Sequence, residues 1–193
     1  MTKCNNCPHT LDRCPDDLLS HNEISQDSLD NLIKKSIKDL YLNDYYLIKH
    51  KLYEVSVVAQ FFFYFKRRMK DYNSFYDIDM EYSKIGENPK TIIMTDKQKT
   101  NARPELIVHK RGCYDNNLIY IEFKGYWNRE YEDDFKKIKA FTNQNSTINS
   151  NRKLVSYKYK YGLFIKLNEN NIELTWFSNG KQVSDSQKYM IQL

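Results

Sequence analysis

The sequence predicts an α/β domain in which helices flank a mixed β-sheet. Three observations predict this class. Apolar residues recur at helical spacing in 28–40 and in 51–70. Short apolar segments with the length of strands occupy much of the stretch from 76 to 124. A third helical pattern at 130–143 is followed by further strands, so helices and strands alternate along the chain as they do in α/β domains.

The first half of the chain is expected to begin with two helices. The first covers about 28–40, with Asp27 or Ser28 as its N-cap. The second covers about 51–70 and carries a wide apolar stripe that ends in lysines and arginines, the charge that a helix C-terminus favours. Glu54 lies one turn before this stripe and on the same side, which suits either a capping residue or an active-site acid.

The middle of the chain is expected to form three strands. Residues 76–82 alternate apolar and acidic side chains, the pattern of a half-buried strand. Residues 86–101 are polar and contain a proline, so a loop is expected there. Two apolar runs, 105–109 and 118–124, are expected to pair as an antiparallel hairpin, because the connection at 110–117 is rich in turn-forming residues.

The last third is expected to continue with a helix and more strands. The helix at 130–143 begins with acidic residues and continues with lysines, the order that the helix dipole favours. Strands are expected at 161–167 and 172–177, with a short one at 189–193. The expected core order is therefore α-β-β-β-α-β, with extra strands towards the C-terminus.

Composition permits nucleic-acid binding without requiring it. The chain of 193 residues carries a formal net charge of +5, with 40% hydrophobic and 28% charged residues, which is ordinary for one globular domain. Its beginning lacks the basic and then apolar pattern of a secretory signal. The longest apolar stretch, 55–65, falls far short of the roughly 20 residues that span a bilayer. We therefore expect a cytoplasmic protein without a membrane partner.

Residues 1–25 are polar and rich in turn formers, and we expect them to form an extension to a single domain at 26–193. The extension holds three cysteines and a nearby histidine. A Cys-x-x-Cys spacing followed by a third cysteine is compatible with a tetrahedral zinc site. The alternative is a solvated tail with reduced thiols. The candidate zinc ligands are Cys4, Cys7, Cys14 and His9.

Acidic and basic side chains gather where the two hairpin strands begin and end. Glu122 and Lys124 share one face of their strand, because side chains alternate along a strand, while Ile121 and Phe123 share the other. In an antiparallel hairpin the start of one strand lies beside the end of the next, so Glu105 becomes a neighbour of Glu122. Adjacent carboxylates repel each other, and a divalent cation removes that cost. This chemistry suits metal-assisted hydrolysis of a phosphodiester; a surface cluster of the same residue types is the alternative.

Three pieces of the chain stand in a specific order: Glu54 on a helix, Arg103-Pro104-Glu105 where a strand begins, and Ile121-Glu122-Phe123-Lys124 where the next strand ends. In this context the chain resembles the PD-(D/E)xK nuclease superfamily, which has a restriction-endonuclease-like fold, and within it a bacterial branch. The resemblance covers about residues 50–167. One departure is that a glutamate, Glu105, stands where this branch usually has an aspartate, so the reach of the side chain differs.

The resemblance implies a magnesium-dependent endonuclease that hydrolyses phosphodiester bonds, with DNA rather than RNA as the expected substrate and Mn²⁺ as a possible substitute for Mg²⁺. Glu54 would complete the metal site, in part through water. The implied site residues are the metal ligands Glu105, Glu122, Glu54 and the backbone carbonyl of Phe123, the water-positioning Lys124, and Glu81 as a further candidate near the same edge.

Basic residues near this site are candidate phosphate contacts, and a solvated surface role is an equal alternative for each. They are Lys110, Arg111, Lys136 and Lys139. Many nucleases of this fold act as dimers, so the resemblance also makes a homodimer possible. Two other functions stay open: a module on the same fold that binds nucleic acid or protein without catalysis, and an interaction protein whose function lies in a zinc-binding tail.

Overall fold

We describe the fold from a computed structural model, in which residues 24–82, 103–111, 116–144, 157–183 and 185–191 are described, together with the backbone of short strands between 83 and 102. The helices are α1 (Gln26–Asn43), α2 (Tyr45–Lys49), α3 (Glu54–Tyr72) and α4 (Glu132–Thr142). The strands are β1 (Asp77–Met80), β2 (Lys84–Ile85), β3 (Asn88–Pro89), β4 (Thr91–Ile93), β5 (Lys99–Asn101), β6 (Leu106–His109), β7 (Asn117–Gly125), β8 (Tyr161–Leu167), β9 (Asn171–Ser178), β10 (Lys181–Gln182) and β11 (Gln187–Met190).

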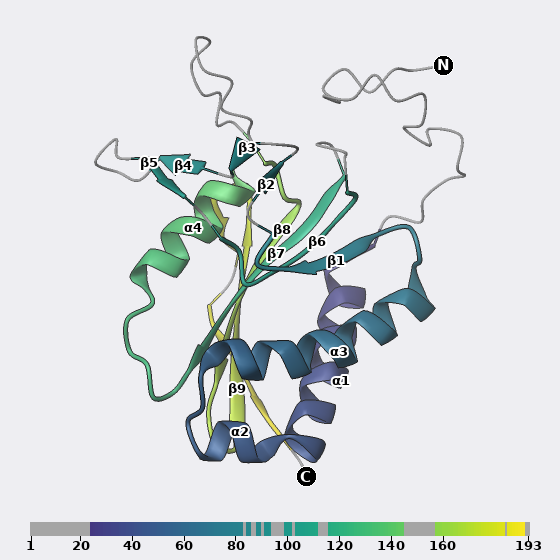
Figure 1. The fold of residues 1–193 in the computed structure, drawn as a ribbon, viewed down its shortest axis with the longest axis vertical. Helices are drawn as coiled ribbons and strands as arrows, with labels where there is room; N and C mark the ends of the chain where they lie inside the picture. Colours follow the sequence, from purple (N-terminus) through teal and green to yellow (C-terminus); the bar gives the residue numbers. More distant parts are fainter. Residues whose placement is uncertain are drawn as a thin grey trace.

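A mixed sheet organises the described residues. Six of its seven strands run in the order β1-β6-β7-β8-β9-β10, and the seventh, β11, pairs with β9. Strands β7 and β8 are parallel. The pairs β1–β6, β6–β7 and β8–β9 are antiparallel. A parallel pair needs a long crossover connection, and α4 lies on that connection (Figure 1). The structure is thus of the α/β class with helices on a mixed sheet, as the sequence predicts.

Helices α1 and α3 cover one face of the sheet. Helix α3 places an apolar stripe against it, because buried residues recur along the helix at near-helical spacing. The Phe61 ring meets the Phe123 ring of β7 edge-on, with centroids 4.9 Å apart. This contact fixes α3 on β7 and brings Glu54, two turns earlier on the helix, to the end of that strand. The buried residues of the stripe are Val57, Val58, Phe61, Phe65 and Met69.

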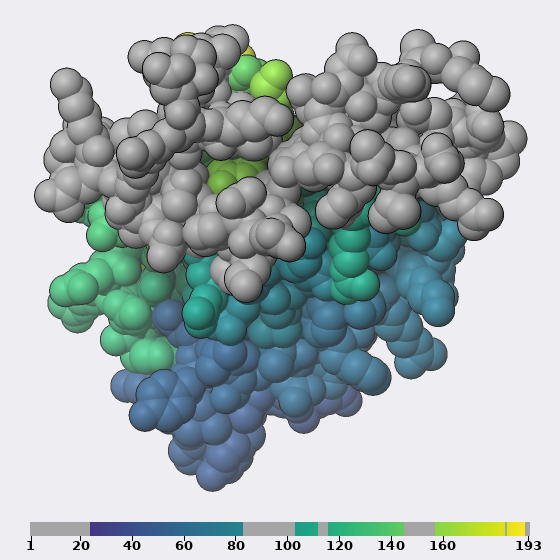
Figure 2. All heavy atoms as spheres, turned by 45° about the horizontal axis from the view of Figure 1, so that its top comes forward, coloured from purple at the N-terminus to yellow at the C-terminus, as the bar shows by residue number. Residues whose placement is uncertain are grey.

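Helix α4 covers the opposite face and encloses a second, aromatic core. The Tyr120 ring of β7 stacks on Phe141 of α4 with centroids 4.4 Å apart. Close approach requires glycine at position 162 of β8, since a Cβ atom there would lie 2.4 Å from Cγ2 of Ile138. Figure 2 shows α4, in green, on a different side of the molecule from the blue α1–α3 layer. Residues on the α4 face of β7 therefore lie between the sheet and this helix.

The predicted helices and sheet strands are present with shifted ends. Strand β8 has the predicted bounds, and the hairpin of β6 and β7 is antiparallel as predicted. The N-cap prediction is wrong: the side chain of Ser25 accepts the capping hydrogen bond from the Ser28 amide. The expected loop at 86–101 is also wrong, because β4 pairs with β5 within it. Helix α2 was not predicted, since five residues show too little periodicity.

Two further sequence expectations concern membranes and the N-terminal extension. No helix in the described part of the chain has the length and apolar character that crossing a membrane requires. The candidate zinc ligands Cys4, Cys7, Cys14 and His9 lie outside the described residues, as does Cys113. The zinc hypothesis and the division at residue 25 stay predictions.

Candidate active site at the end of the β6–β7 hairpin

The alternation predicted for β7 is present. Ile121 and Phe123 belong to the core under α1 and α3, whereas Tyr120 belongs to the core under α4. Glu122 and Lys124 lie on the α4 side with Tyr120, and both are buried, with exposed fractions of 1% and 8%. A carboxyl group and an amine thus interrupt an apolar strand inside the molecule, where each needs a partner.

Glu105 lies beside this pair, just before β6. Its Oε2 atom accepts a hydrogen bond of 2.5 Å from the backbone amide of Phe123. Burial raises the pKa of the Glu105 carboxyl to about 7; the Phe123 hydrogen bond opposes this shift, and the charge of Glu54 adds to it. The longer side chain of a glutamate therefore does reach the end of β7 from this position.

Glu122 is the most deeply buried acid of the cluster. The hydroxyl of Tyr120 donates a hydrogen bond to its Oε1 atom. Burial first, and then repulsion from Glu105, raise the pKa of Glu122 well above its usual range, while Lys137 and the Tyr120 hydrogen bond act in the opposite direction. Two carboxyl groups that disfavour each other's ionisation mark a place where positive charge is needed.

Lys124 is held between two acids from different helices. Its Nζ atom lies 3.3 Å from Oε2 of Glu54 and 3.1 Å from Oδ2 of Asp134. The other Glu54 oxygen, Oε1, accepts a 2.9 Å hydrogen bond from the Gly125 amide. Burial alone would lower the pKa of Lys124, but the charges of Asp134 and Glu54 raise it above its usual value. Lys124 is therefore a fixed ammonium group at the end of β7.

Asp134 and Lys137 of α4 were missed by the sequence reasoning. Asp134 is buried, and its Oδ1 atom accepts a 3.0 Å hydrogen bond from Nζ of Lys137. The attraction of Glu122, together with the hydrogen bond to Asp134, raises the pKa of Lys137 although burial opposes it. A signal was available: Asp134, Lys137, Ile138 and Phe141 follow helical spacing, so the two charged residues share the inner face of α4 with the two apolar ones.

The charges of the cluster do not balance. In the described part of the chain it combines four carboxyl groups with the two amines of Lys124 and Lys137, which leaves two excess negative charges when all are ionised. The carboxyl groups belong to Glu54, Glu105, Glu122 and Asp134. No three histidine, cysteine or acidic side chains of the described residues are arranged to hold a metal ion as they stand. Glu54 in particular is directed to Lys124 and Gly125 rather than to the Glu105–Glu122 pair.

The remaining site candidates lie in other surroundings. Glu81 is exposed and its Oε2 lies 3.6 Å from Nη1 of Arg103, although its amide contacts the Glu105 carbonyl. Arg111 binds Asp79 through Nε at 2.8 Å and through a second nitrogen. Lys110 donates to the Phe75 carbonyl, Lys136 binds Asp133, and Lys139 is exposed. Arg111, Lys110 and Lys136 thus already hold protein partners.

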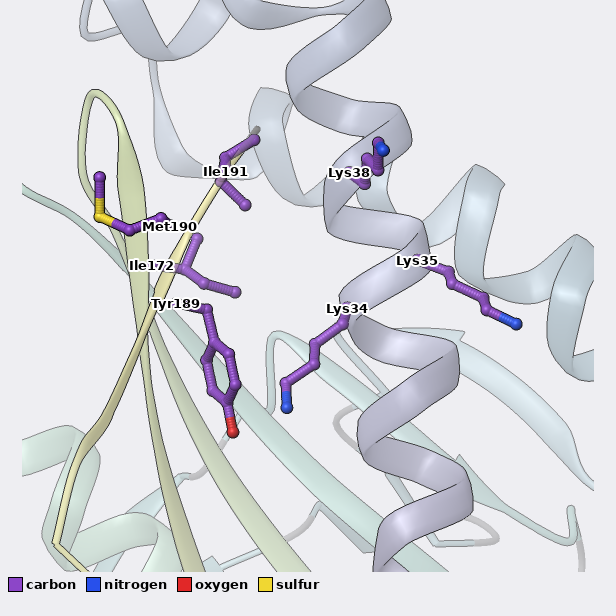
Figure 3. Close-up of a pocket in the computed structure, with 7 residues that line it drawn as sticks. All are labelled: Lys34, Lys35, Lys38, Ile172, Tyr189, Met190 and Ile191. Carbon is purple, nitrogen blue, oxygen red and sulfur yellow. The ribbon is translucent and has the colours of Figure 1, made fainter. Parts of the chain in front are cut away.

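A separate pocket of about 270 Å³ lies between α1 and β11 (Figure 3). Lys34 and Tyr189 point towards each other across it, and the lysine nitrogen lies 3.4 Å from the ring centroid. Its lining has no carboxylate, so it offers a hard cation no acidic ligand. The residues that line it are Lys34, Lys35, Lys38, Ile172, Tyr189, Met190 and Ile191.

Comparison with known proteins adds no identification. No family model, curated protein or solved structure matches this chain significantly.

Proposed function

We propose that this protein is a metal-dependent nuclease that hydrolyses phosphodiester bonds at the Glu105–Glu122 pair, with DNA rather than RNA as the proposed substrate. The observation that carries the proposal is the charge of the cluster. The partly buried Glu105 and the buried Glu122 have raised pKa values and repel each other, and the group as a whole would carry two excess negative charges if every member were ionised. One divalent cation would neutralise that excess and allow both carboxyl groups to ionise.

The donor set suits magnesium. Glu105 and Glu122 each use one oxygen in a hydrogen bond, to the Phe123 amide and the Tyr120 hydroxyl, and among the described residues their second oxygens accept none. Carboxylate oxygens are the ligands that Mg²⁺ prefers, and Mn²⁺ accepts the same ligands. The Phe123 carbonyl would be a third ligand. A bound cation would polarise the phosphoryl oxygen and lower the pKa of a water molecule.

Lys124 would hold the attacking water or a phosphate oxygen beside the carboxylate pair. Glu54 of α3 and Asp134 of α4 both bind its ammonium group, so the position of the amine is fixed before a substrate binds. Its charge would oppose the negative charge that develops on the phosphorane-like transition state. Glu54 acts in this proposal as the residue that orients Lys124, and it reaches a cation only through water.

The order of elements supports the restriction-endonuclease-like fold of the PD-(D/E)xK superfamily as part of the same proposal. Helix α3, strands β1, β6 and β7, helix α4 and strand β8 follow one another in the α-β-β-β-α-β order. Glu105 and Glu122 lie where β6 begins and β7 ends, at the end of the hairpin opposite its turn. The net charge of +5 suits a nucleic-acid substrate, and a homodimer that cuts both strands remains part of the hypothesis.

The test is a cleavage assay on single-stranded DNA, duplex DNA and RNA with Mg²⁺, with Mn²⁺ or with EDTA. The parent protein should cleave with metal and not with EDTA. Glu122→Ala and Lys124→Ala should each lower the rate by about 100-fold or more. Glu132→Ala and Lys181→Ala make the same changes at exposed positions and should cleave like the parent.

Two outcomes would contradict the proposal. Cleavage that survives both site substitutions would place the chemistry elsewhere or in a contaminant. A parent protein that binds nucleic acid without cleaving it under any of these conditions would favour the alternative function, a binding module on the same fold. Stoichiometric zinc in the purified protein would separately support a metal-binding N-terminal extension.

A further inference from the structure

A second lysine stands directly beside Lys124. Strands β7 and β8 are parallel, and their register pairs Lys124 with Lys166 and Glu122 with Phe164. Paired residues of parallel strands point to the same face, and neighbouring strands lie roughly 4.8 Å apart. Phe164 belongs to the core under α4, which places Lys166 on the α4 face as well. Lys166 therefore borders the candidate active site.

Lys166 differs from the other cations of this region in its partners. Lys124 and Lys137 bind Asp134, and Arg111 binds Asp79. In the described part of the chain no carboxylate lies within ion-pair distance of Lys166. Glu173 faces it on β9, but the Oε1 atom of Glu173 accepts a 3.1 Å hydrogen bond from Asn168. The ammonium of Lys166 is thus available to an anion from outside.

The ammonium group of Lys166 also lies near the face of an aromatic ring. The lysine nitrogen lies 6.0 Å from the ring centroid of Tyr131, the residue that precedes α4. Tyr131 packs on Phe135 and Phe164, with centroids 5.4 Å and 5.6 Å away, and 38% of its surface is exposed. A cation attracted to a ring face keeps its charge while its side chain loses freedom. Tyr131 also lies one turn before Asp134 on the chain, so the ring and Lys166 lie next to the residues of the cluster.

We infer that Lys166, positioned by Tyr131, binds a phosphate of the nucleic-acid strand next to the one that is cleaved. This inference rests on the proposed function, since it assigns the substrate contact of that site. A phosphate bound by lysine releases condensed counterions and fixes the register of the strand without reading its sequence. In this proposal the phosphate contact of Lys166 stabilises the bound substrate and the transition state equally, whereas Lys124 contacts the phosphate that reacts.

The experiment measures the salt dependence of binding. Fluorescently labelled DNA is titrated with protein in EDTA over a series of KCl concentrations, and kcat and KM are measured separately with Mg²⁺. In Lys166→Gln the slope of log affinity against log salt should become shallower by about 0.7 to 0.9, the value for one lost phosphate contact. KM should rise while kcat stays near that of the parent, and different DNA sequences should be affected equally.

Matched variants separate charge from fold. Lys166→Arg should keep the parent slope, and Tyr131→Phe should keep it because the ring remains. Lys181→Gln removes the same charge from an exposed position on β10 and should also leave the slope unchanged. Tyr131→Leu should weaken binding, although less than Lys166→Gln does.

The outcomes distinguish this inference from the proposed function. A parent that cleaves DNA, with an unchanged slope in Lys166→Gln or an equal loss in Lys166→Arg, overturns the inference alone. A parent that binds with the expected slope change but never cleaves supports the phosphate contact and contradicts hydrolysis. A parent that neither binds nor cleaves nucleic acid overturns both.

Discussion

The ammonium of Lys124 lies 3.1 Å from Oδ2 of Asp134, so a residue of α4 holds the lysine at the end of β7. Asp134 also binds Lys137 at 3.0 Å, and it thereby links both amines of the cluster. The carboxylate is buried, and each of its two oxygens lies against a lysine nitrogen, Oδ2 against Lys124 and Oδ1 against Lys137. We therefore regard Asp134 as a residue that positions Lys124.

Replacing Asp134 with asparagine should lower kcat by about 100-fold, because a displaced reacting group costs about that much. The same change should move the alkaline limb of the pH–rate profile to lower pH, since Asp134 contributes the largest attraction that raises the pKa of Lys124. Asp133→Asn is the matched control, because Asp133 is exposed and binds Lys136. An Asp134→Asn protein with the parent profile would remove Asp134 from this role.

Stability of the metal-free protein should fall as pH rises from about 4.5 to about 7. Glu105 ionises near its ordinary pKa of 4.5 in the unfolded chain but near 7 in the folded protein. The folded state therefore holds a proton that the unfolded state has lost, and a higher pH favours unfolding. Denaturant titrations across this window measure the effect. In Glu105→Gln the decline should be smaller; a decline equal to that of the parent would contradict the assignment.

Loss of the Tyr120 hydroxyl should raise the pKa of Glu122 further. That hydroxyl donates to the carboxylate and lowers its pKa, while the ring itself packs on Phe141. Tyr120→Phe should keep the fold, cost about 1–3 kcal/mol of stability at most, and shift the acidic limb of the cleavage profile to higher pH. Tyr161→Phe, whose ring packs in the other core, should leave the profile in place. Equal profiles for both variants would mean that Tyr120 does not act on Glu122.

A methyl group at position 162 should separate α4 from the sheet. The new Cβ atom would meet Cγ2 of Ile138 at 2.4 Å and Cγ2 of Thr142 at 2.9 Å. Gly162→Ala should cost about 1–3 kcal/mol by overpacking and should lower activity by displacing Asp134 and Lys137. Thermal unfolding and kcat measure the two effects. A stable variant with full activity would show that α4 tolerates this shift.

The sheet end of the site could be predicted from the sequence because it depends on short-range geometry. Strand alternation places Glu122 and Lys124 on one face, and hairpin pairing brings Glu105 alongside, so residue spacing alone determines these neighbours. The helical stripe of α3 likewise predicts which side of that helix faces the sheet, and with it the direction of Glu54.

The α4 side of the site was harder to predict for a physical reason. Acidic residues at a helix N-terminus satisfy the helix dipole whether they are exposed like Asp133 or buried like Asp134. Helical spacing does place Asp134 on the same face as Ile138 and Phe141. That this face comes close enough to bind Lys124 depends on the packing of α4 against Gly162, a tertiary contact that periodicity does not report. Lys166 was missed similarly, because its place beside Lys124 follows from the register of two strands far apart in the chain.

Calorimetric titration with MgCl₂ tests the central claim, that Glu105 and Glu122 together hold a divalent cation. The titration is done slightly below neutral pH in two buffers of different ionisation enthalpy, so that proton release is measured along with binding. The parent should bind Mg²⁺ and release protons, because the cation displaces those that raised pKa values retain. Glu122→Gln should bind far more weakly, and Glu132→Gln like the parent. Absence of binding in the parent, or equal binding in Glu122→Gln, would contradict the account.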